Sequence, residues 1–227
     1  MSILLYIVYS IMIILFLFLG ISILIRGPQK RINQMFFIFL LLIALGLINN
    51  IIYRTIDDPQ LNIIMNQVSI FFPSLSIVFL FLFNLIILKS DKIITDKLKL
   101  ILIIIWVILC SMFFVIAAII PDSVTFNTDN NPVWRWEFAA YGLIIDQLSF
   151  TFILIVNVQI YKRFEHEELK KKYLYTIASV LMFDWVLVGN FINNWWSNDI
   201  FRQIFPITSL IAIPACIFLY IGVKRET

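Results

Sequence analysis

The chain has 227 residues, of which 62% belong to the apolar and aromatic set AVILMFWYC and only 14% are charged. Soluble domains have roughly 45–50% apolar and roughly 25% charged residues, so this composition indicates an integral membrane protein. A spanning helix takes about 20 residues, and seven spans leave only about 80 residues for two tails and six loops. That remainder excludes a soluble kinase, nucleotide-binding or receptor domain within the chain.

Seven apolar runs, separated by charged or turn-forming residues, are each long enough to cross a bilayer. They lie at about 3–25, 33–53, 61–89, 98–120, 134–161, 171–195 and 201–223. We therefore expect an all-α membrane protein, a bundle of seven transmembrane helices that forms one domain over residues 1–227. The first run lacks a basic leader and a small-residue cleavage pattern, so we interpret it as a retained span rather than a signal peptide.

The basic residues predict the orientation of this bundle. The gaps that follow the first, third, fifth and seventh runs contain 14 of the 17 lysine and arginine residues, and the opposite side contains Arg54, Arg135 and Arg202. By the positive-inside rule, the amino terminus lies outside and the carboxyl terminus is cytoplasmic, as in a multi-pass protein of the cell membrane. Four tryptophans, which favour the membrane interface, fall at the predicted outer ends of spans five and six. They are Trp134, Trp136, Trp195 and Trp196.

The third span has one polar face. Steps of three and four residues connect a series of positions along one side of the helix. The series is Asn62, Asn66, Ser69, Pro73, Ser76, Leu80 and Asn84, of which all but Pro73 and Leu80 are polar. Because lipid does not solvate polar groups, we expect this face to point into the bundle. Hydrogen bonding between helices is the preferred interpretation, and a stripe that lines a ligand site is the other.

The seventh span repeats this spacing and contains two prolines. Arg202, Pro206, Ser209, Cys216 and Tyr220 share one face, which we also expect to point inward. Pro206 and Pro214 lack a backbone donor, so the helix can bend near them. We favour a static kink over a moving hinge.

Two carboxylates fall deep within predicted spans. Asp146 lies about 15 Å inward from Trp136, and Asp184 lies about 16 Å inward from Trp195. Both are near the midplane, where no basic residue is available, so we expect at least one to be protonated. A proton-sensitive switch or ligand contact is one interpretation, and a neutral acid hydrogen-bonded within the bundle is the other. A functional pair would share a hydrogen bond, directly or through one water, inside a dry cavity reachable from outside.

The predicted outer end collects further polar groups and forms a candidate vestibule. Its members are Asn49, Asn50, Tyr53, Asn62, Asn66, Asn190, Asn193, Asn194, Arg202 and Gln203. Ordinary interfacial chemistry accounts for the outermost of these, but explains Asn49 and Asn190 less well. The ligand-binding or switch candidates are therefore Asp146, Asp184, Asn49, Asn62, Asn66, Asn190 and Arg202.

Catalytic chemistry has no visible basis in the sequence. No span has an interior lysine for a retinal Schiff base, and no serine-hydrolase, metalloprotease, phosphate-loop or C-x-x-C motif occurs. His166 is the only histidine, which excludes haem held between two histidines and a histidine-rich metal site. Cys110 and Cys216 lie within apolar runs and are interpreted as buried thiols. We expect no enzyme activity, no cofactor, no metal and no nucleic-acid partner.

The chain resembles the seven-helix sensor module found at the amino terminus of some bacterial and archaeal histidine kinases. The likeness rests on the topology, the short loops, Asn33-Gln34-Met35-Phe36 at the start of span two and Pro132-Val133-Trp134-Arg135-Trp136 before span five. In that family the last helix continues into cytoplasmic signalling domains, whereas this sequence stops at Thr227. The resemblance therefore implies a free-standing receptor-like unit or a fragment whose output lies on another polypeptide.

These observations lead to one preferred function and two alternatives. The preferred function is a non-catalytic sensory module that binds a small or amphiphilic ligand from the outer side and signals through a cytoplasmic or membrane partner. A proton-coupled transporter or channel that uses Asp146 and Asp184 is the alternative from another class. A structural subunit of a membrane complex, with the lipid bilayer and other subunits as its only partners, is the third.

Overall fold

The computed structural model describes residues 3–56, 58–90, 93–127 and 131–223, and about 84% of the chain is helical. Within these residues, seven helical segments are long and apolar enough to cross a membrane, so the chain is an all-α, multi-pass membrane protein. The helices are α1 (Ile3–Ile25), α2 (Arg31–Tyr53), α3 (Pro59–Lys89), α4 (Asp96–Ile119), α5 (Trp136–Arg163), α6 (Glu167–Trp196), α7 (Asp199–Ser209) and α8 (Ala212–Val223). Two short strands, β1 (Val124–Phe126) and β2 (Pro132–Trp134), lie between α4 and α5.

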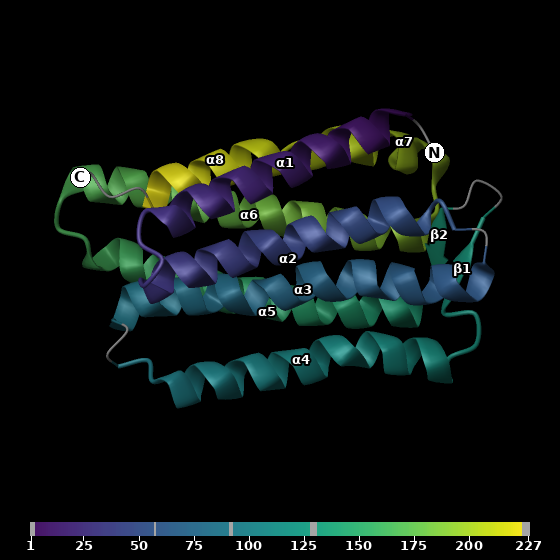
Figure 1. Ribbon diagram of the computed structural model, residues 1–227, viewed down its shortest axis with the longest axis horizontal. Coiled ribbons are helices and arrows are strands. Elements are labelled where there is room, and N and C mark those ends of the chain that lie inside the picture. The colour runs from purple at the N-terminus through teal and green to yellow at the C-terminus, as the bar shows by residue number, and fades with distance from the viewer. Residues whose placement is uncertain (1–2, 57, 91–92, 128–130, 224–227) are drawn as a thin grey trace.

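Helix α3 lies at the centre of the bundle and helix α4 at its edge. The most apolar stretch of α3 is 67% buried and packs against α2, α4 and α5. The corresponding stretch of α4 is only 11% buried, and Figure 1 shows α4 below the other helices with one side uncovered. Asn62, Asn66, Ser69, Ser76 and Asn84 are all buried, which confirms that the polar face of α3 points into the protein.

The ends of the bundle differ in composition. The hairpin end, at the right of Figure 1, holds β1, β2 and the turns from α2 to α3 and from α6 to α7. The basic end, at the left, holds the turns from α1 to α2, from α3 to α4 and from α5 to α6. At the basic end the guanidinium of Arg163 donates to the carbonyl of Leu88, and Arg31 pairs with Asp96. Lys92, Lys224 and Arg225, which contribute to the predicted orientation, lie outside the described residues.

Local sequence determines where several helices begin. Asp58 accepts hydrogen bonds from the backbone N–H groups of Gln60 and Leu61, and Pro59 is the first residue of α3. Proline suits this position because the first N–H groups of a helix have no partner within it. Thr95 caps α4 in the same manner through the N–H of Leu98.

The seventh span consists of two helices rather than one. Helix α7 ends at Ser209, and α8 begins at Ala212 after the turn at Leu210 and Ile211. The ring of Pro214 would collide with the carbonyl of Leu210 in a continuous helix. That carbonyl instead accepts a tighter hydrogen bond from the N–H of Ile213, at 2.9 Å. Pro206 and Pro214 thus lie on either side of a break in the helix.

The hairpin replaces the start of the fifth predicted span. Strands β1 and β2 pair antiparallel with Val124 opposite Trp134, and α5 begins only at Trp136. Trp134 is 2% exposed, so its prediction as an interfacial residue at a helix end is wrong. Its ring packs edge-to-face on Phe138 and Phe191, where its apolar area is buried in protein. Trp136, Trp195 and Trp196 are exposed at the same end of the bundle.

Candidate functional site

The predicted vestibule is covered by the hairpin. The indole nitrogen of Trp134 donates to the side-chain oxygen of Asn66 at 3.1 Å, and both residues are buried. Arg54 reaches from the end of α2 to the side chain of Asn131, at 2.9 Å. Arg202 reaches from α7 to the backbone carbonyl of Pro132, also at 2.9 Å. These contacts attach the hairpin to three helices.

Two more vestibule candidates hold helices together. The amide nitrogen of Asn49 donates to the hydroxyl of Ser69 at 2.7 Å and to the carbonyl of Met65, which joins α2 to α3. Asn62 donates to the carbonyl of Ile56 at 2.8 Å and so closes the turn between the same helices. Asn49, Asn62, Asn66 and Arg202 therefore have structural partners, in agreement with the preferred interpretation of hydrogen bonding within the bundle.

A cavity of about 90 Å³ lies within the bundle beside these contacts. It is lined by α1, α2, α3, α5, α6, α7 and α8, so both ends of the sequence contribute to it. Of the seven candidate site residues, Asn190 alone is among its lining residues. The sequence analysis placed Asn50 in the vestibule and Ser209 on the inward face of span seven, and both also line the cavity.

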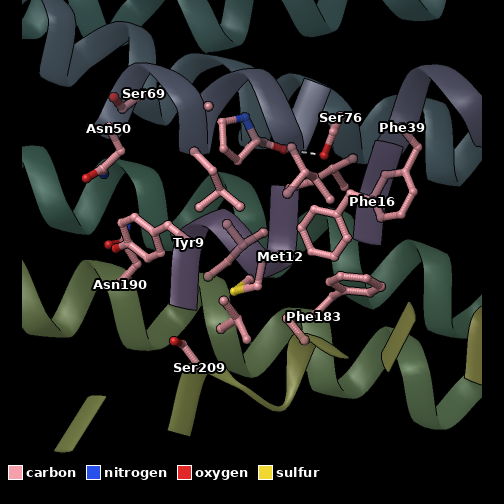
Figure 2. A pocket seen from close by; sticks show the side chains of 18 of the residues that line it. Tyr9, Met12, Phe16, Phe39, Asn50, Ser69, Ser76, Phe183, Asn190 and Ser209 are labelled. Carbon is pink, nitrogen blue, oxygen red and sulfur yellow. Dashed lines mark hydrogen bonds between the residues drawn. The ribbon is translucent and has the colours of Figure 1, made fainter. Parts of the chain in front are cut away.

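The cavity has a polar end and an aromatic end (Figure 2). Asn50, Asn190 and Tyr9 lie together on one side of the view, and Phe16, Phe39 and Phe183 lie on the other. The ring of Phe183 contacts Phe39 edge-to-face with 5.4 Å between centroids, and Phe16 at 6.3 Å. Tyr9 and Phe16 are seven residues apart on α1, as are Asn190 and Phe183 on α6, so the ends are separated by about 10 Å.

The hydrogen bonds at the polar end are directed in a consistent way. The side-chain oxygen of Asn50 accepts from Arg54 at 3.1 Å, and that of Asn190 accepts from Asn194 at 3.3 Å. The amide nitrogen of each asparagine can therefore donate to a ligand, because no further side-chain hydrogen bond of either residue is found among the described residues. The hydroxyls of the lining serines donate to carbonyls of their own helices. These bonds are Ser76 to Pro73, Ser209 to Pro206 and Ser69 to Met65.

The two aspartates have separate partners. Asp146 is 1% exposed and its Oδ2 accepts from the hydroxyl of Ser74 at 3.4 Å, whereas Asp184 is partly exposed and accepts from Gln147. No hydrogen bond joins the two carboxyl groups in the described part of the chain, and neither lines the cavity. The two carboxyl groups therefore do not form a direct pair inside the cavity.

Helical geometry explains this separation. Asp146 and Gln147 are consecutive residues on α5, so their side chains point about 100° apart. Asp146 faces α3 through Ser74, and Gln147 faces α6 through Asp184. Similar depth in the bilayer, from which we predicted proximity, gives no information about this angle.

A second buried polar cluster lies nearer the basic end. The hydroxyl of Tyr173 is within hydrogen-bond distance of the side-chain oxygens of Asn84, at 3.0 Å, and Asn157, at 2.5 Å. All three residues are buried, and they connect α6, α3 and α5. The sequence analysis identified Asn84 as inward-facing but missed Asn157 and Tyr173. Asn157 lies 11 residues after Asp146 on α5, which is about three helical turns. The spacing of polar residues along the whole of α5 would therefore have identified Asn157.

The aromatic half of the cavity was also missed. Tyr9, Met12 and Phe16 follow steps of three and four residues on α1, but leucine, isoleucine and phenylalanine surround them. A polar-stripe search cannot detect an inward face in such a segment. Cys110 and Cys216 are free and buried, which confirms their interpretation as buried thiols.

Comparison with models of protein families and with curated protein sequences gives no match to this chain.

Proposed function

We propose that this protein is a non-catalytic, seven-helix ligand-binding module that senses a small amphiphilic molecule and signals through a separate partner. The cavity carries this proposal, because it combines a polar end at Asn50 and Asn190 with an aromatic end at Phe16, Phe39 and Phe183. Ligand sites are typically apolar pockets with a few convergent polar groups. In the proposed orientation, the amino terminus and the hairpin end face the outside of the cell membrane, and the basic end faces the cytoplasm.

The arrangement of helices suggests how occupancy would be transmitted. Ser209 and Ala212 line the cavity on either side of the break between α7 and α8. Helix α8 continues to Tyr220, which hydrogen-bonds Arg26 at the basic end of α1. A ligand that binds one arrangement of this break better than another would shift the population between them. A separate signalling partner, which the resemblance to sensor modules implies, would then bind the changed surface at the basic end.

Photoreactive probes test the binding part of this proposal. The purified protein in phosphatidylcholine nanodiscs is irradiated with octyl-chain diazirine probes that carry a neutral, an anionic or a cationic head group. We expect saturable labelling of residues that line the cavity by at least one probe. Met12→Trp replaces an unbranched side chain that lines the cavity by a larger indole and should abolish the labelling. Met112→Trp, at an exposed position of α4, should not abolish it. Absence of saturable labelling by all three probes would overturn the proposal.

Crosslinking tests the signalling part. In native membranes, a partner should be crosslinked at the basic end. The yield of this crosslinked product should change when the probe that labels the cavity is added. The same yield with and without that probe, together with normal probe binding, would instead favour a structural subunit of a membrane complex.

A proton-coupled transporter is the second candidate, favoured by one observation. Asp146 is 1% exposed in a spanning helix, and its Oδ1 has no hydrogen-bond partner among the described residues. Carboxyl groups in such positions occur in proton relays. In liposomes that contain a pH-sensitive dye, a transporter would move protons, and Asp146→Asn would stop this movement. A sensory module would leave the internal pH unchanged.

A further inference from the structure

We infer that the cavity selects an uncharged, single-chain amphiphile whose head group presents an oxygen acceptor, such as an alcohol, a ketone or an ester. This inference rests on the proposed function, because it specifies the ligand class of the same cavity.

The shape of the cavity favours a single chain. The cavity is elongated, because its polar and aromatic ends lie about 10 Å apart along the helices. Its volume of about 90 Å³ exceeds the roughly 10–15 Å³ that one water needs. A slender alkyl chain fits this space along the helices, with its end among Phe16, Phe39 and Phe183.

The lining determines the charge of the head group. Aspartate, glutamate, lysine, arginine and histidine are all absent from the residues that line the cavity. The nearest cation in the hydrogen-bond network is Arg54, which lies behind Asn50 and also binds Asn131 and the face of the Tyr53 ring. A carboxylate or ammonium head inside the cavity would be a buried charge without a partner, which costs several kcal/mol. A neutral head avoids this cost.

Hydrogen-bond direction determines which neutral group is preferred. Arginine has only donors, so Asn50 must turn its oxygen toward Arg54 and its NH2 group away from it. Asn190 uses its oxygen in the same way, on Asn194. Figure 2 shows Asn50 and Asn190 on the same side of the cavity, so we expect the acceptor oxygen of the ligand at that end. Since Ser209 directs its proton to the carbonyl of Pro206, a hydroxyl head could also donate to the oxygen of Ser209.

Competition between matched probes tests this selectivity. Octanol, octanoate, octylammonium and octane share one chain length and compete against a photoreactive octanol in phosphatidylcholine nanodiscs, with each concentration corrected for its measured partition into the bilayer. We expect octanol to compete at least about tenfold better than either ion, and better than octane, which lacks the acceptor oxygen.

The variant Asn50→Asp isolates the donor. It retains an oxygen for Arg54 but replaces the NH2 donor by a second acceptor, so 2-octanone, whose ketone can only accept, should compete roughly threefold to tenfold less well. Gln60→Glu is the matched control, because Gln60 is an exposed amide on α3 near the hairpin end, and it should leave competition unchanged. Circular dichroism and thermal unfolding establish that both variants fold.

The possible outcomes separate the two proposals. Equal or stronger competition by octanoate or octylammonium would overturn the neutral-head inference while leaving a ligand-binding module in place. Equal competition by octanol and octane, with no effect of Asn50→Asp, would overturn the role of the amide donors. No saturable labelling by any probe would overturn both the inference and the proposed function.

Discussion

Helices α3 and α4 are consecutive and comparably apolar, yet they occupy opposite environments. The most apolar stretch of α3 has a mean hydropathy of 2.5 and is 67% buried, whereas that of α4 has a mean hydropathy of 3.2 and is 11% buried. Helix α3 carries a row of asparagines and serines on one face. Helix α4 is almost free of such groups, and its Ser111 donates to the carbonyl of Val107 on the same helix.

This difference separates two kinds of information in a membrane sequence. Hydropathy reports whether a segment can reside in lipid, and both helices satisfy it. The angular distribution of polar groups reports which face must be covered by protein, because a bilayer offers those groups no partner. Helix α3 has such a face and is buried, whereas the exposed side chains of α4 are left to the lipid.

The largest expected effect is a change of leucine to alanine in α3. Leu80 is 0% exposed, so Leu80→Ala should leave a cavity and lower the free energy of unfolding by about 2–5 kcal/mol. Leu100 on α4 is 57% exposed, and Leu100→Ala should cost less than about 0.5 kcal/mol. Denaturant titration in mixed micelles measures both. Equal losses would show that α4 is covered by protein in the membrane.

The next effect concerns a close approach of α2 to α3 at Gly46. A Cβ atom at Gly46 would lie 2.6 Å from both Cγ and Cδ of Pro73 and 3.1 Å from the carbonyl oxygen of Ser69. A proline ring and a backbone oxygen cannot rotate away, so Gly46→Ala should cost about 1–3 kcal/mol by the same titration. Ala118→Val, at an exposed position of α4, is the control and should have no measurable effect. A neutral Gly46→Ala would contradict the tight packing of α2 on Pro73.

The positions of the helices could be predicted from sequence, and several internal contacts could not. Each predicted span corresponds to a helix or helix pair because about 20 apolar residues have few other stable conformations in a bilayer. The hairpin was missed because Trp134 was counted as the first residue of the fifth span, and hydropathy does not distinguish a buried strand from the first turn of a helix. Two of its partners, Asn66 and Arg202, were therefore counted among the ligand-binding or switch candidates.

The candidate site was predicted only in part, since it depends on angles between helices. Asn190 was a candidate because a polar residue more than one turn inside a span needs a partner, and Asn50 was placed in the same vestibule. The aromatic end consists of phenylalanines that are indistinguishable in sequence from the many others in the chain. The two predicted aspartates have different direct partners, because similar depth in the bilayer does not determine rotation about the α5 axis.

A smaller effect is expected where the hairpin is attached to α3. Trp134→Phe removes the indole donor to Asn66 but retains an aromatic ring against Phe138 and Phe191. The buried oxygen of Asn66 is then unpaired, and the free energy of unfolding should fall by about 1–3 kcal/mol, toward the lower value. A double-mutant cycle with Asn66→Leu should give a coupling of about 0.6 kcal/mol and at most about 1.7 kcal/mol. Zero coupling would show that the hairpin is held by its ring contacts alone.

The smallest effect is expected at the polar contact between α4 and α3. The indole nitrogen of Trp106 donates to the backbone carbonyl of Ser74 at 2.8 Å, one residue after Pro73. Trp106→Phe should cost only about 0.6 kcal/mol, because one interhelical hydrogen bond is lost and the ring still packs on the core. The consequence for position should exceed that for stability, since the most apolar stretch of α4 is only 11% buried.

Spin labels at Met112 on α4 and Ile64 on α3, both exposed, report that position by pulsed electron resonance. The distance distribution between them should broaden in Trp106→Phe and remain narrow in Trp185→Phe, a control at an exposed indole of α6. A narrow distribution in both variants would mean that apolar packing and two other polar contacts fix the position of α4. These contacts are the hydrogen bond from Tyr141 to the carbonyl of Leu109 and the pair of Arg31 with Asp96. A distribution that broadens only in Trp106→Phe would show that the hydrogen bond from Trp106 to Ser74 is needed to hold α4 in position.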